Sequence, residues 1–390
     1  MNIAILTPGV LPVPTVRGGA VEMLTECLLD YNEQHLQHDI TIYGIYDAKI
    51  TKSLLNKYKY CHFELFNQNS LRSKIKRFIY SKTTSKNYYN HYLDYYAYQA
   101  LKKISCKKND ILLIENRANF VLMASTITNI PIVLHLHNDT LDAQTINAND
   151  ILSKSTKILT VSGYIKKRVD TIDTTNDKVH VVYNGIDIDR FKNINPVYSR
   201  KDFGFDNDDF VLVYTGRLDP IKGVKELLQS FLLLNQEKIK LLIVGGSNYG
   251  NSSENEYTQE IKSLVSNLGN RVVFTGHLPY ESIPAILSLC DIGVIPSICE
   301  DALTLSSIED MAVGLPLIVT RSGGIPEAVD EECAIIIEKD ETMIEKLAQS
   351  ILLLYSDKDK QEKMSIHAKQ RALLFNKDNY AKNIFKELEL

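Results

Sequence analysis

The chain has 390 residues, a charged fraction of 24% and a formal net charge of −4. This length is enough for two or three domains, and the charge excludes an overall affinity for nucleic acid. The apolar runs all fall short of the roughly 20 residues that a membrane-spanning helix needs. No basic region precedes the apolar residues of the N-terminus, so we expect no signal peptide.

Short apolar runs rich in Val, Ile and Leu alternate with longer amphipathic runs along the chain, as in parallel sheets that are buried on both faces. The first half predicts six strands, at residues 3–6, 40–43, 111–114, 132–136, 157–161 and 180–182. The second half predicts six more, at 211–214, 240–244, 272–274, 292–295, 317–320 and 334–337. Two such sets predict an α/β fold with two Rossmann-like domains.

The six cysteines are scattered between these elements, with no Cys-x-x-Cys pair and no histidine partner pattern. Isolated cysteines in apolar stretches are mostly small buried hydrophobic residues. We therefore expect a reducing, cytoplasmic compartment and no zinc site.

The loop after the first predicted strand leads to Arg17, Gly18 and Gly19, directly before a helical pattern. Two glycines let backbone amides approach a phosphate or a sugar closely. The alternative is a plain turn before a helix.

The segment from Lys52 to Lys108 holds 13 Lys or Arg, two acidic residues and nine tyrosines. Basic residues with interfacial aromatic rings suit an anionic membrane surface. The alternative is a solvated helix face with tyrosines packed in the core. Basic and aromatic residues also occur together in single-stranded RNA binding, but no RNA-module motif accompanies them here.

Three polar residues follow the third and fourth predicted strands. Glu115 and Arg117 end the third strand, and His137 ends the fourth. Strand alternation puts His135 on the same face as His137. A lone histidine is more often structural, and we interpret His135 in that way.

Arg217 and Lys222 lie between the strand predicted at 211–214 and a helical pattern at 224–234. A helix N-terminus offers free amides and the positive end of its dipole. Together with two cations, such a turn suits a diphosphate. The alternative is a solvated loop with two unpaired cations.

Asp301 and Glu309 form the second motif, eight positions apart, with a helix expected to begin near Ser306. Both carboxylates could then lie at the N-terminal end of the helix and accept hydrogen bonds from sugar and ribose hydroxyls. The alternative is an ordinary capped helix, with Ser306 as the cap and Glu309 at the third helical position. That alternative leaves Asp301 without a role.

Taken together, these motifs resemble family 4 of the retaining glycosyltransferases, which have the GT-B fold. The family pattern Gly-Arg-Leu-x-x-x-Lys-Gly matches residues 216–223, and Glu-x7-Glu with Ala-Met-Ala-x-Gly-x-Pro corresponds to 301–316. Further matches follow in the family's order, at 184–187 with Phe191, at Gly245-Gly246 and at 323–327. The run 11–20 resembles a bacterial subgroup associated with extracellular polysaccharide and spore-coat sugars.

Three positions depart from the family pattern. Asp301 stands where the family has Glu, and Glu300 beside it is a candidate substitute. Leu303-Thr304 replaces a frequent Phe-Gly, and Asp310 replaces the first Ala of the helix pattern. The first two departures concern recognition of the donor sugar more than the grip on the diphosphate.

The resemblance implies two Rossmann-like domains facing a central cleft. The acceptor domain would span 1–193, completed by a crossover helix at 376–390, and the donor domain would span 194–375. The implied reaction is transfer of a sugar, with retention, from a nucleotide diphosphate sugar to an acceptor hydroxyl. We expect a UDP-sugar and a role in bacterial surface or extracellular polysaccharide synthesis.

The resemblance also implies the roles of individual residues. Arg217 and Lys222 would neutralise the leaving diphosphate in place of a metal, and no Asp-x-Asp tract ends a predicted strand, so we expect neither metal nor cofactor. His137 and Asp301 complete the expected catalytic set. The expected donor contacts are Gly18, Gly19, Gly216, His277, Leu278, Glu300, Thr304, Leu305 and Glu309. The expected acceptor-side residues are Arg17, Glu115 and Arg117.

Many members of the family act on lipid-linked acceptors. We therefore expect a lipid-linked saccharide acceptor, with the segment from Lys52 to Lys108 holding the protein at the inner face of an anionic membrane. Two other functions stay open. A nucleotide-sugar 2-epimerase would need further acid–base groups around the sugar, and a degenerate scaffold or coat protein would need none of the site.

Overall fold

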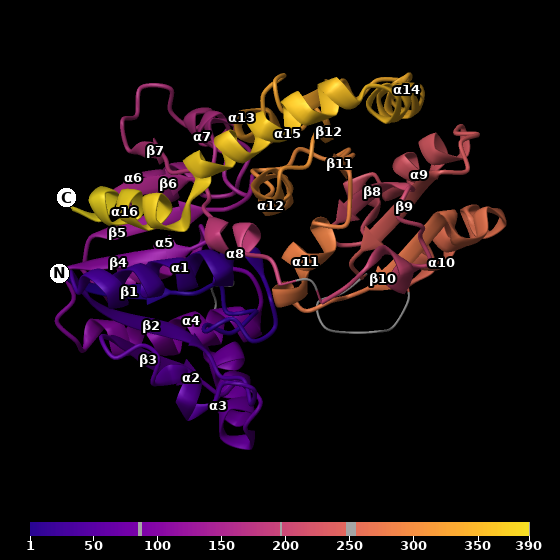
Figure 1. Cartoon of the computed structure of the whole chain (residues 1–390). Coiled ribbons are helices and arrows are strands. Elements are labelled where there is room, and N and C mark those ends of the chain that lie inside the picture. Colours follow the sequence, from indigo (N-terminus) through magenta and orange to yellow (C-terminus); the bar gives the residue numbers. More distant parts are fainter. Residues whose placement is uncertain (85–87, 196, 247–254, 390) are drawn as a thin grey trace. The chain divides into compact units, whose positions relative to one another are not determined.

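The computed structural model describes residues 1–84, 88–195, 197–246 and 255–389, which form two compact α/β units (Figure 1). The first unit comprises Met1–Asn184 with Asp378–Leu390, and the second comprises Gly185–Lys377. The predicted boundary after residue 193 lies later in the chain. The difference arises because helix α8 (Ile188–Lys192) packs against α12 (Leu305–Val313) of the second unit.

The first unit is built on a parallel sheet of seven strands in the order β3-β2-β1-β4-β5-β6-β7. These strands are β1 (Asn2–Leu6), β2 (Asp39–Ile45), β3 (Cys61–Phe66), β4 (Ile111–Glu115), β5 (Ile132–Leu136), β6 (Lys157–Thr160) and β7 (Val179–Val181). The prediction of six strands was wrong because it missed β3. Only Cys61 and Phe66 at the two ends of this edge strand are buried, and His62 and Glu64 interrupt the apolar residues of its sequence.

Seven helices connect these strands within the described part of the first unit (Figure 1). They are α1 (Ala20–His35), α2 (Lys52–Leu55), α3 (Leu71–Thr83), α4 (His91–Ser105), α5 (Phe120–Ile127), α6 (Ala148–Lys154) and α7 (Gly163–Asp170). Helices that connect parallel strands cover the faces of the sheet and leave its carboxyl edge open to loops.

The last helix, α16 (Lys377–Leu388), returns to the first unit (Figure 1). The ring of Phe385 lies 4.6 Å from that of His38 and 6.0 Å from that of Tyr31. Glu387 accepts a hydrogen bond of 3.0 Å from Lys157. These contacts confirm the C-terminal helix that crosses back onto the N-terminal domain.

The second unit has a parallel sheet of six strands in the order β10-β9-β8-β11-β12-β13. They are β8 (Phe210–Thr215), β9 (Ile239–Val244), β10 (Val272–Gly276), β11 (Ile292–Ile295), β12 (Leu317–Thr320) and β13 (Ala334–Ile337), as predicted to within two residues at each end. Its further helices are α9 (Val224–Leu232), α10 (Glu256–Leu264), α11 (Ile283–Leu287), α13 (Ile325–Ala328), α14 (Met343–Ser356) and α15 (Lys358–Ala372).

The strand order reverses between β1 and β4 in the first sheet and between β8 and β11 in the second. Open α/β sheets bind ligands outside the carboxyl ends of the strands at such a point. A ligand-binding site is therefore expected at the loops after β1, β4 and β5 and at those after β8 and β11. In the part of the chain that the structure describes, no helix is long and apolar enough to cross a membrane.

Candidate active site

The loop after β8 is shaped by a tight turn that requires glycine. Residues Pro220–Lys222 form one 3-10 turn, and Gly223 follows with a φ of 72°, which favours glycine. A Cβ atom on Gly223 would lie 1.9 Å from the carbonyl oxygen of Pro296, the first residue after β11. The glycine therefore lets the two loops of the switch point touch.

Backbone hydrogen bonds fix the same two loops against each other. The amides of Ile298 and Cys299 both donate to the carbonyl of Ile221, at 3.1 Å each. On the other side of the turn, the Tyr214 hydroxyl donates to the carbonyl of Arg217 at 2.7 Å. The positions of Arg217 and Lys222 are thus set by the sheet and by the loop after β11.

Lys222 and Asp301 meet directly, because the Lys222 ammonium donates to Oδ1 of Asp301. Asp301 is only 8% exposed, and its Oδ2 has no hydrogen-bond partner among the described residues. Its backbone is held as well, since its amide donates to Oγ of Ser322 at 3.3 Å and its carbonyl accepts from the Gly324 amide at 2.7 Å. A buried carboxylate with one unpartnered oxygen is suited to accept from a ligand hydroxyl.

Glu300 is held in a different place. Its carboxylate pairs with Lys339 and accepts a hydrogen bond from the amide of Gly323. Its side chain is 46% exposed, whereas that of Asp301 is 10% exposed. Of the two acids, the geometry therefore favours Asp301 for the position next to Lys222.

Arg217 lies at the same edge with a side chain that is 45% exposed, and its Nη1 is 3.5 Å from Oδ2 of Asp219. The amide of Gly245, directly after β9, donates at 3.0 Å to the carbonyl of Gly276, the last residue of β10, which brings the ends of the two strands together. His277 is exposed and Leu278 half-buried in the loop that follows.

Helix α12 begins one residue before the predicted start. Thr304 is its N-cap and Leu305 its first residue, so Glu309 lies in the second turn. The hydroxyl of Ser307 donates to the carbonyl of Thr304 at 2.7 Å. The alternative of a Ser306 cap with Glu309 at the third helical position is therefore wrong.

Glu309 is buried, with 7% of its surface exposed. Burial raises its pKa to about 7, although a hydrogen bond with Tyr280 and the charge of Arg190 act in the opposite direction. A buried carboxyl group whose charged form is disfavoured costs stability and is characteristic of binding and catalytic sites.

Asp310 next to it is a second buried carboxyl group, which sequence analysis treated as a mild departure. It is 1% exposed, and a Cβ atom on Gly293 of β11 would lie 2.4 Å from its Oδ2. Burial, followed by the neighbouring Glu309, raises the pKa of Asp310 well above its usual range. Gly293 was the sequence feature that could have indicated burial of Asp310, since a glycine on β11 leaves room for a side chain larger than Ala.

In the first unit, Glu115, His135 and His137 form a buried cluster at the ends of β4 and β5. Oε2 of Glu115 lies 2.8 Å from Nε2 of His137 and 3.1 Å from Nδ1 of His135. The register explains the meeting, because Glu115 pairs with His135 across the two strands. His135, which we interpreted as structural, thus contacts both candidate residues.

The charges of this cluster are coupled. Burial raises the pKa of Glu115, but the two imidazoles outweigh it and lower that pKa to about 2. Burial and then His135 lower the pKa of His137 to about 4, so its ring is neutral near pH 7. With Nε2 donating to Glu115, Nδ1 of His137 is an acceptor, and it has no partner among the described residues.

The three side chains also offer ligand atoms within 4.8 Å of one another. One carboxylate and two imidazoles are a set that a divalent transition metal accepts. Among the described residues of the first unit, these three form the group that could hold a metal.

Arg17 and Arg117 have protein partners in the structure. The Arg17 guanidinium donates to the carboxylate of Asp47, just after β2. Arg117 donates through Nε to the carbonyl of Pro8 at 3.1 Å, and its guanidinium lies 5.1 Å from the ring centre of Tyr89. Arg117 therefore helps to fix the loop after β1.

Gly18 and Gly19 precede α1 with φ values of 78° and 112°. A Cβ atom on Gly19 would lie 2.2 Å from Oε2 of Glu22, whereas Gly18 faces open space. Glu22 is buried, and burial raises its pKa to about 7. Glu22 lies at the same edge of the sheet as the two glycines and was not predicted as a site residue.

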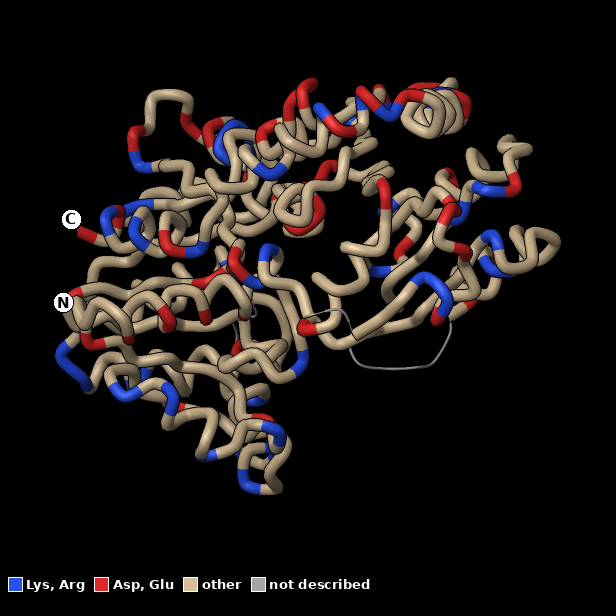
Figure 2. The backbone as a smooth tube through the Cα atoms, viewed as in Figure 1, with Lys and Arg blue, Asp and Glu red and all other residues tan. Residues whose placement is uncertain are grey.

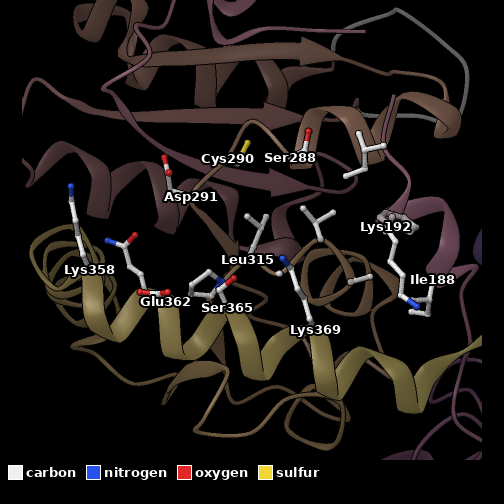
Figure 3. A pocket seen from close by; sticks show the side chains of 17 residues that line it. Ile188, Lys192, Ser288, Cys290, Asp291, Leu315, Lys358, Glu362, Ser365 and Lys369 are labelled. Atoms are coloured by element: carbon white, nitrogen blue, oxygen red, sulfur yellow. The ribbon is translucent and has the colours of Figure 1, made fainter. Parts of the chain in front are cut away.

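A pocket of about 750 Å³ lies elsewhere in the second unit, between α8, the end of α12 and α15 (Figure 3). Lys358, Glu362, Ser365 and Lys369 point toward it from α15 (Figure 3). None of the predicted site residues is among the residues that line this pocket.

Two parallel-sheet units of this order, with a final helix that returns to the first unit, define the GT-B fold. Sucrose-phosphate synthase from Thermosynechococcus elongatus has a TM-score of 0.78 and 19% identity, over 99% of this chain and 97% of that chain. Anabaena HepE in complex with UDP and glucose has a TM-score of 0.75 and 19% identity, over 100% and 99%.

Two family models match consecutive parts of the chain. Glycosyltransferase Family 4 matches residues 64–190, and Glycosyl transferases group 1 matches residues 198–371. The chain therefore belongs to the glycosyltransferases of family 4. The putative glycosyltransferase YtcC of Bacillus subtilis is 26% identical over 98% of this chain and 91% of its own length. Spore coat protein SA of the same organism is 24% identical over 95% and 94%.

Proposed function

We propose that this glycosyltransferase moves a hexose, with retention, from a nucleotide diphosphate sugar to an acceptor hydroxyl. The observation that carries the proposal is the meeting of Lys222 with the buried Asp301 at the switch point of the second sheet. A cation for the leaving phosphate and an acceptor for a sugar hydroxyl lie side by side there. The Anabaena protein of the same fold is known in complex with UDP and glucose, which supports UDP as the nucleotide.

Arg217 and Lys222 supply the charge that the leaving diphosphate needs. The negative charge on the diphosphate grows as the glycosidic bond breaks, and fixed cations aimed at it lower the barrier. Because two cations already face this edge, we propose that the reaction needs no metal or other cofactor. The amides of Thr304 and Leu305 at the start of α12 add donors, as helix N-termini do for anions.

Two carboxylates bind the hydroxyl groups of the donor. Glu309 accepts from the ribose hydroxyls, and Asp301 accepts from the sugar through its free oxygen. His277 and Leu278 receive the base. Gly216 lets the backbone after β8 approach the phosphates.

In the first unit, His137 contributes an acceptor nitrogen for a sugar hydroxyl. Glu115 acts as a positioning residue, since its hydrogen bond with Nε2 selects the tautomer in which Nδ1 carries the lone pair. The backbone amides at Gly18 and Gly19 approach the donor, and Arg17 serves the acceptor.

The acceptor is proposed to be a lipid-linked saccharide used for a bacterial surface or extracellular polysaccharide. The names of two relatives support this class. One is a spore coat protein, and another, from Salmonella typhimurium, is a lipopolysaccharide 1,2-N-acetylglucosaminetransferase that is 23% identical over 70% of this chain. The spore coat name also favours a second candidate, a coat protein that retains the fold without the reaction.

A thermal-shift screen over UDP-, GDP- and ADP-sugars separates these candidates. A bound donor at about 100 times its Kd is expected to add about 2.7 kcal/mol to the apparent stability. We expect the largest shift with a UDP-sugar and a smaller one with UDP alone. The absence of a shift with every nucleotide sugar would favour the coat protein.

A further inference from the structure

Helix α3 presents large apolar side chains to solvent along one face. The exposed fractions are 75% for Leu71, 53% for Ile75, 63% for Phe78 and 54% for Ile79. Their spacing of four, seven and eight residues places all four on one side of the helix. A contiguous exposed apolar face marks an interaction surface.

The opposite side of α3, which faces the protein, is more polar. Its half-buried residues are Ser73, Arg77 and Tyr80. The Arg77 guanidinium lies 4.9 Å from the ring centre of Tyr92, and the Tyr80 ring lies 5.1 Å from that of Tyr98. A surface helix of a globular protein normally turns its apolar side inward, so the amphipathicity of α3 is reversed.

Cations flank the apolar face. Arg72, Lys74, Lys76 and Lys82 are exposed on α3. The sequence has no acidic residue between Glu64 and Asp94. Blue segments along α3 in Figure 2 therefore mark charges that no acid of the same stretch balances.

Several residues of the basic segment from Lys52 to Lys108 are paired or buried in the structure and are therefore less suited to contact a membrane. Lys57 pairs with Asp30 at 2.7 Å, and Lys103 and Lys107 pair with Glu64 at 2.6 and 3.0 Å. Tyr58, Tyr95 and Tyr96 are buried, as the core alternative expected. Lys86 lies outside the described residues. Exposed cations occur elsewhere in the segment as well, but on α3 they lie beside four exposed apolar side chains.

We propose that α3 lies in the interface of an anionic lipid bilayer. Its four apolar side chains enter the boundary between headgroups and acyl chains, and its lysines and Arg72 contact lipid phosphates. With 13 residues, α3 is too short to span a bilayer, so it lies along the surface. This inference deepens the proposed function, because it places the enzyme where a lipid-linked acceptor is found.

Charge favours a bilayer over a second copy of the chain. A symmetric contact through α3 would place the same cations of two copies against each other. Like charges brought together in this way repel, and no acid on α3 relieves the repulsion. An anionic surface satisfies the apolar face and the cations at once.

The test is sedimentation with vesicles of phosphatidylcholine containing about a quarter phosphatidylglycerol, compared with phosphatidylcholine alone. The wild-type chain is expected to bind the anionic vesicles, and less so as salt rises. Each basic residue at such a surface contributes about a fivefold gain in partition. Replacing Lys74, Lys76 and Lys82 with Glu is therefore expected to reduce binding more than about 100-fold.

Two further variants separate the contributions. The triple variant Leu71→Ser, Ile75→Ser, Phe78→Ser keeps every charge. It is expected to reduce binding at least about tenfold, because each substitution removes an apolar side chain that the bilayer would bury. The matched control replaces Lys52, Lys59 and Lys108 with Glu, exposed lysines outside α3 that give the same change in charge. The control is expected to bind within about fivefold of the wild type.

All variants are checked by circular dichroism and by nucleotide binding, which belongs to the second unit. Retained nucleotide binding with lost vesicle binding supports the role of α3. Failure of the wild type to bind anionic vesicles at low salt would overturn it, as would undiminished binding by the serine variant. A dimer that the serine variant breaks, without vesicle binding, would assign α3 to a second copy. If the wild type bound no nucleotide, that result would instead count against the proposed function.

Discussion

Replacing Lys222 with alanine is expected to lower kcat about 10²- to 10³-fold while changing the KM for the donor much less. The negative charge on the diphosphate grows as the sugar leaves, so a cation at Lys222 stabilises the transition state more than the ground state. Steady-state kinetics with the nucleotide sugar identified by thermal shift measure both constants.

The structure adds a requirement to this experiment. Lys222 also neutralises Asp301, which is buried, and a buried carboxylate without its partner is destabilising. The double variant Lys222→Ala, Asp301→Asn is expected to recover stability without recovering turnover. Lys225→Ala is the matched control, because this nearby lysine pairs with Glu260 at the surface. An unchanged kcat in the single variant would remove Lys222 from the mechanism.

The second large effect concerns the two acids. Glu309→Gln is expected to weaken binding of both UDP and the UDP-sugar, since the ribose is common to them. Asp301→Asn is expected to spare UDP and to weaken the UDP-sugar alone, by about tenfold or more for a lost charge-assisted hydrogen bond. Calorimetric titration with the two ligands separates the roles. If Glu300→Gln were damaging and Asp301→Asn silent, the first acid would be Glu300.

Stability distinguishes a binding role for Glu309 from a structural one. Burial raises its pKa from 4.5 to about 7, so between these values the folded state holds a proton that the unfolded state has lost. The contribution of Glu309 to the free energy of unfolding therefore falls as pH rises through this window, and the loss persists above pH 7.

Glu309→Gln is thus expected to raise Tm at about pH 8 and to change it little near pH 4, below both pKa values. A gain in stability together with weaker nucleotide binding is the signature of a residue kept for function. A lower Tm at pH 8 would show that Glu309 is structural.

The fold followed from the sequence where strands are buried on both faces. The strands of the second sheet consist mainly of Val, Ile, Leu and Phe, although Lys240 interrupts β9, and the glycines at the ends of β8, β9 and β10 mark tight turns. Strand β3 was not predicted, because an edge strand needs apolar residues at alternate positions only and therefore lacks a continuous apolar run. The start of α12 was misplaced by one residue because several adjacent residues can cap a helix, and tertiary contacts choose among them.

The sequence predicted which residues lie at the candidate site, but it did not predict which side chains contact one another. The sequence placed Arg217, Lys222 and Asp301 at strand ends, yet the pairing of Lys222 with Asp301 depends on how two loops pack. The cluster of Glu115, His135 and His137 depends on strand register, which a single sequence leaves open. Burial of Glu309 and Asp310 became visible only with the sheet beneath α12 in place.

The central claim is metal-independent transfer from a nucleotide sugar with retention, and proton NMR of the reaction in EDTA tests it most directly. With an α-linked UDP-sugar and an alcohol or saccharide acceptor, we predict release of UDP and a product whose anomeric signal is that of an α-glycoside. Turnover should continue when EDTA removes divalent ions. A β-linked product, or turnover that stops in EDTA and returns with a divalent ion, would contradict the account.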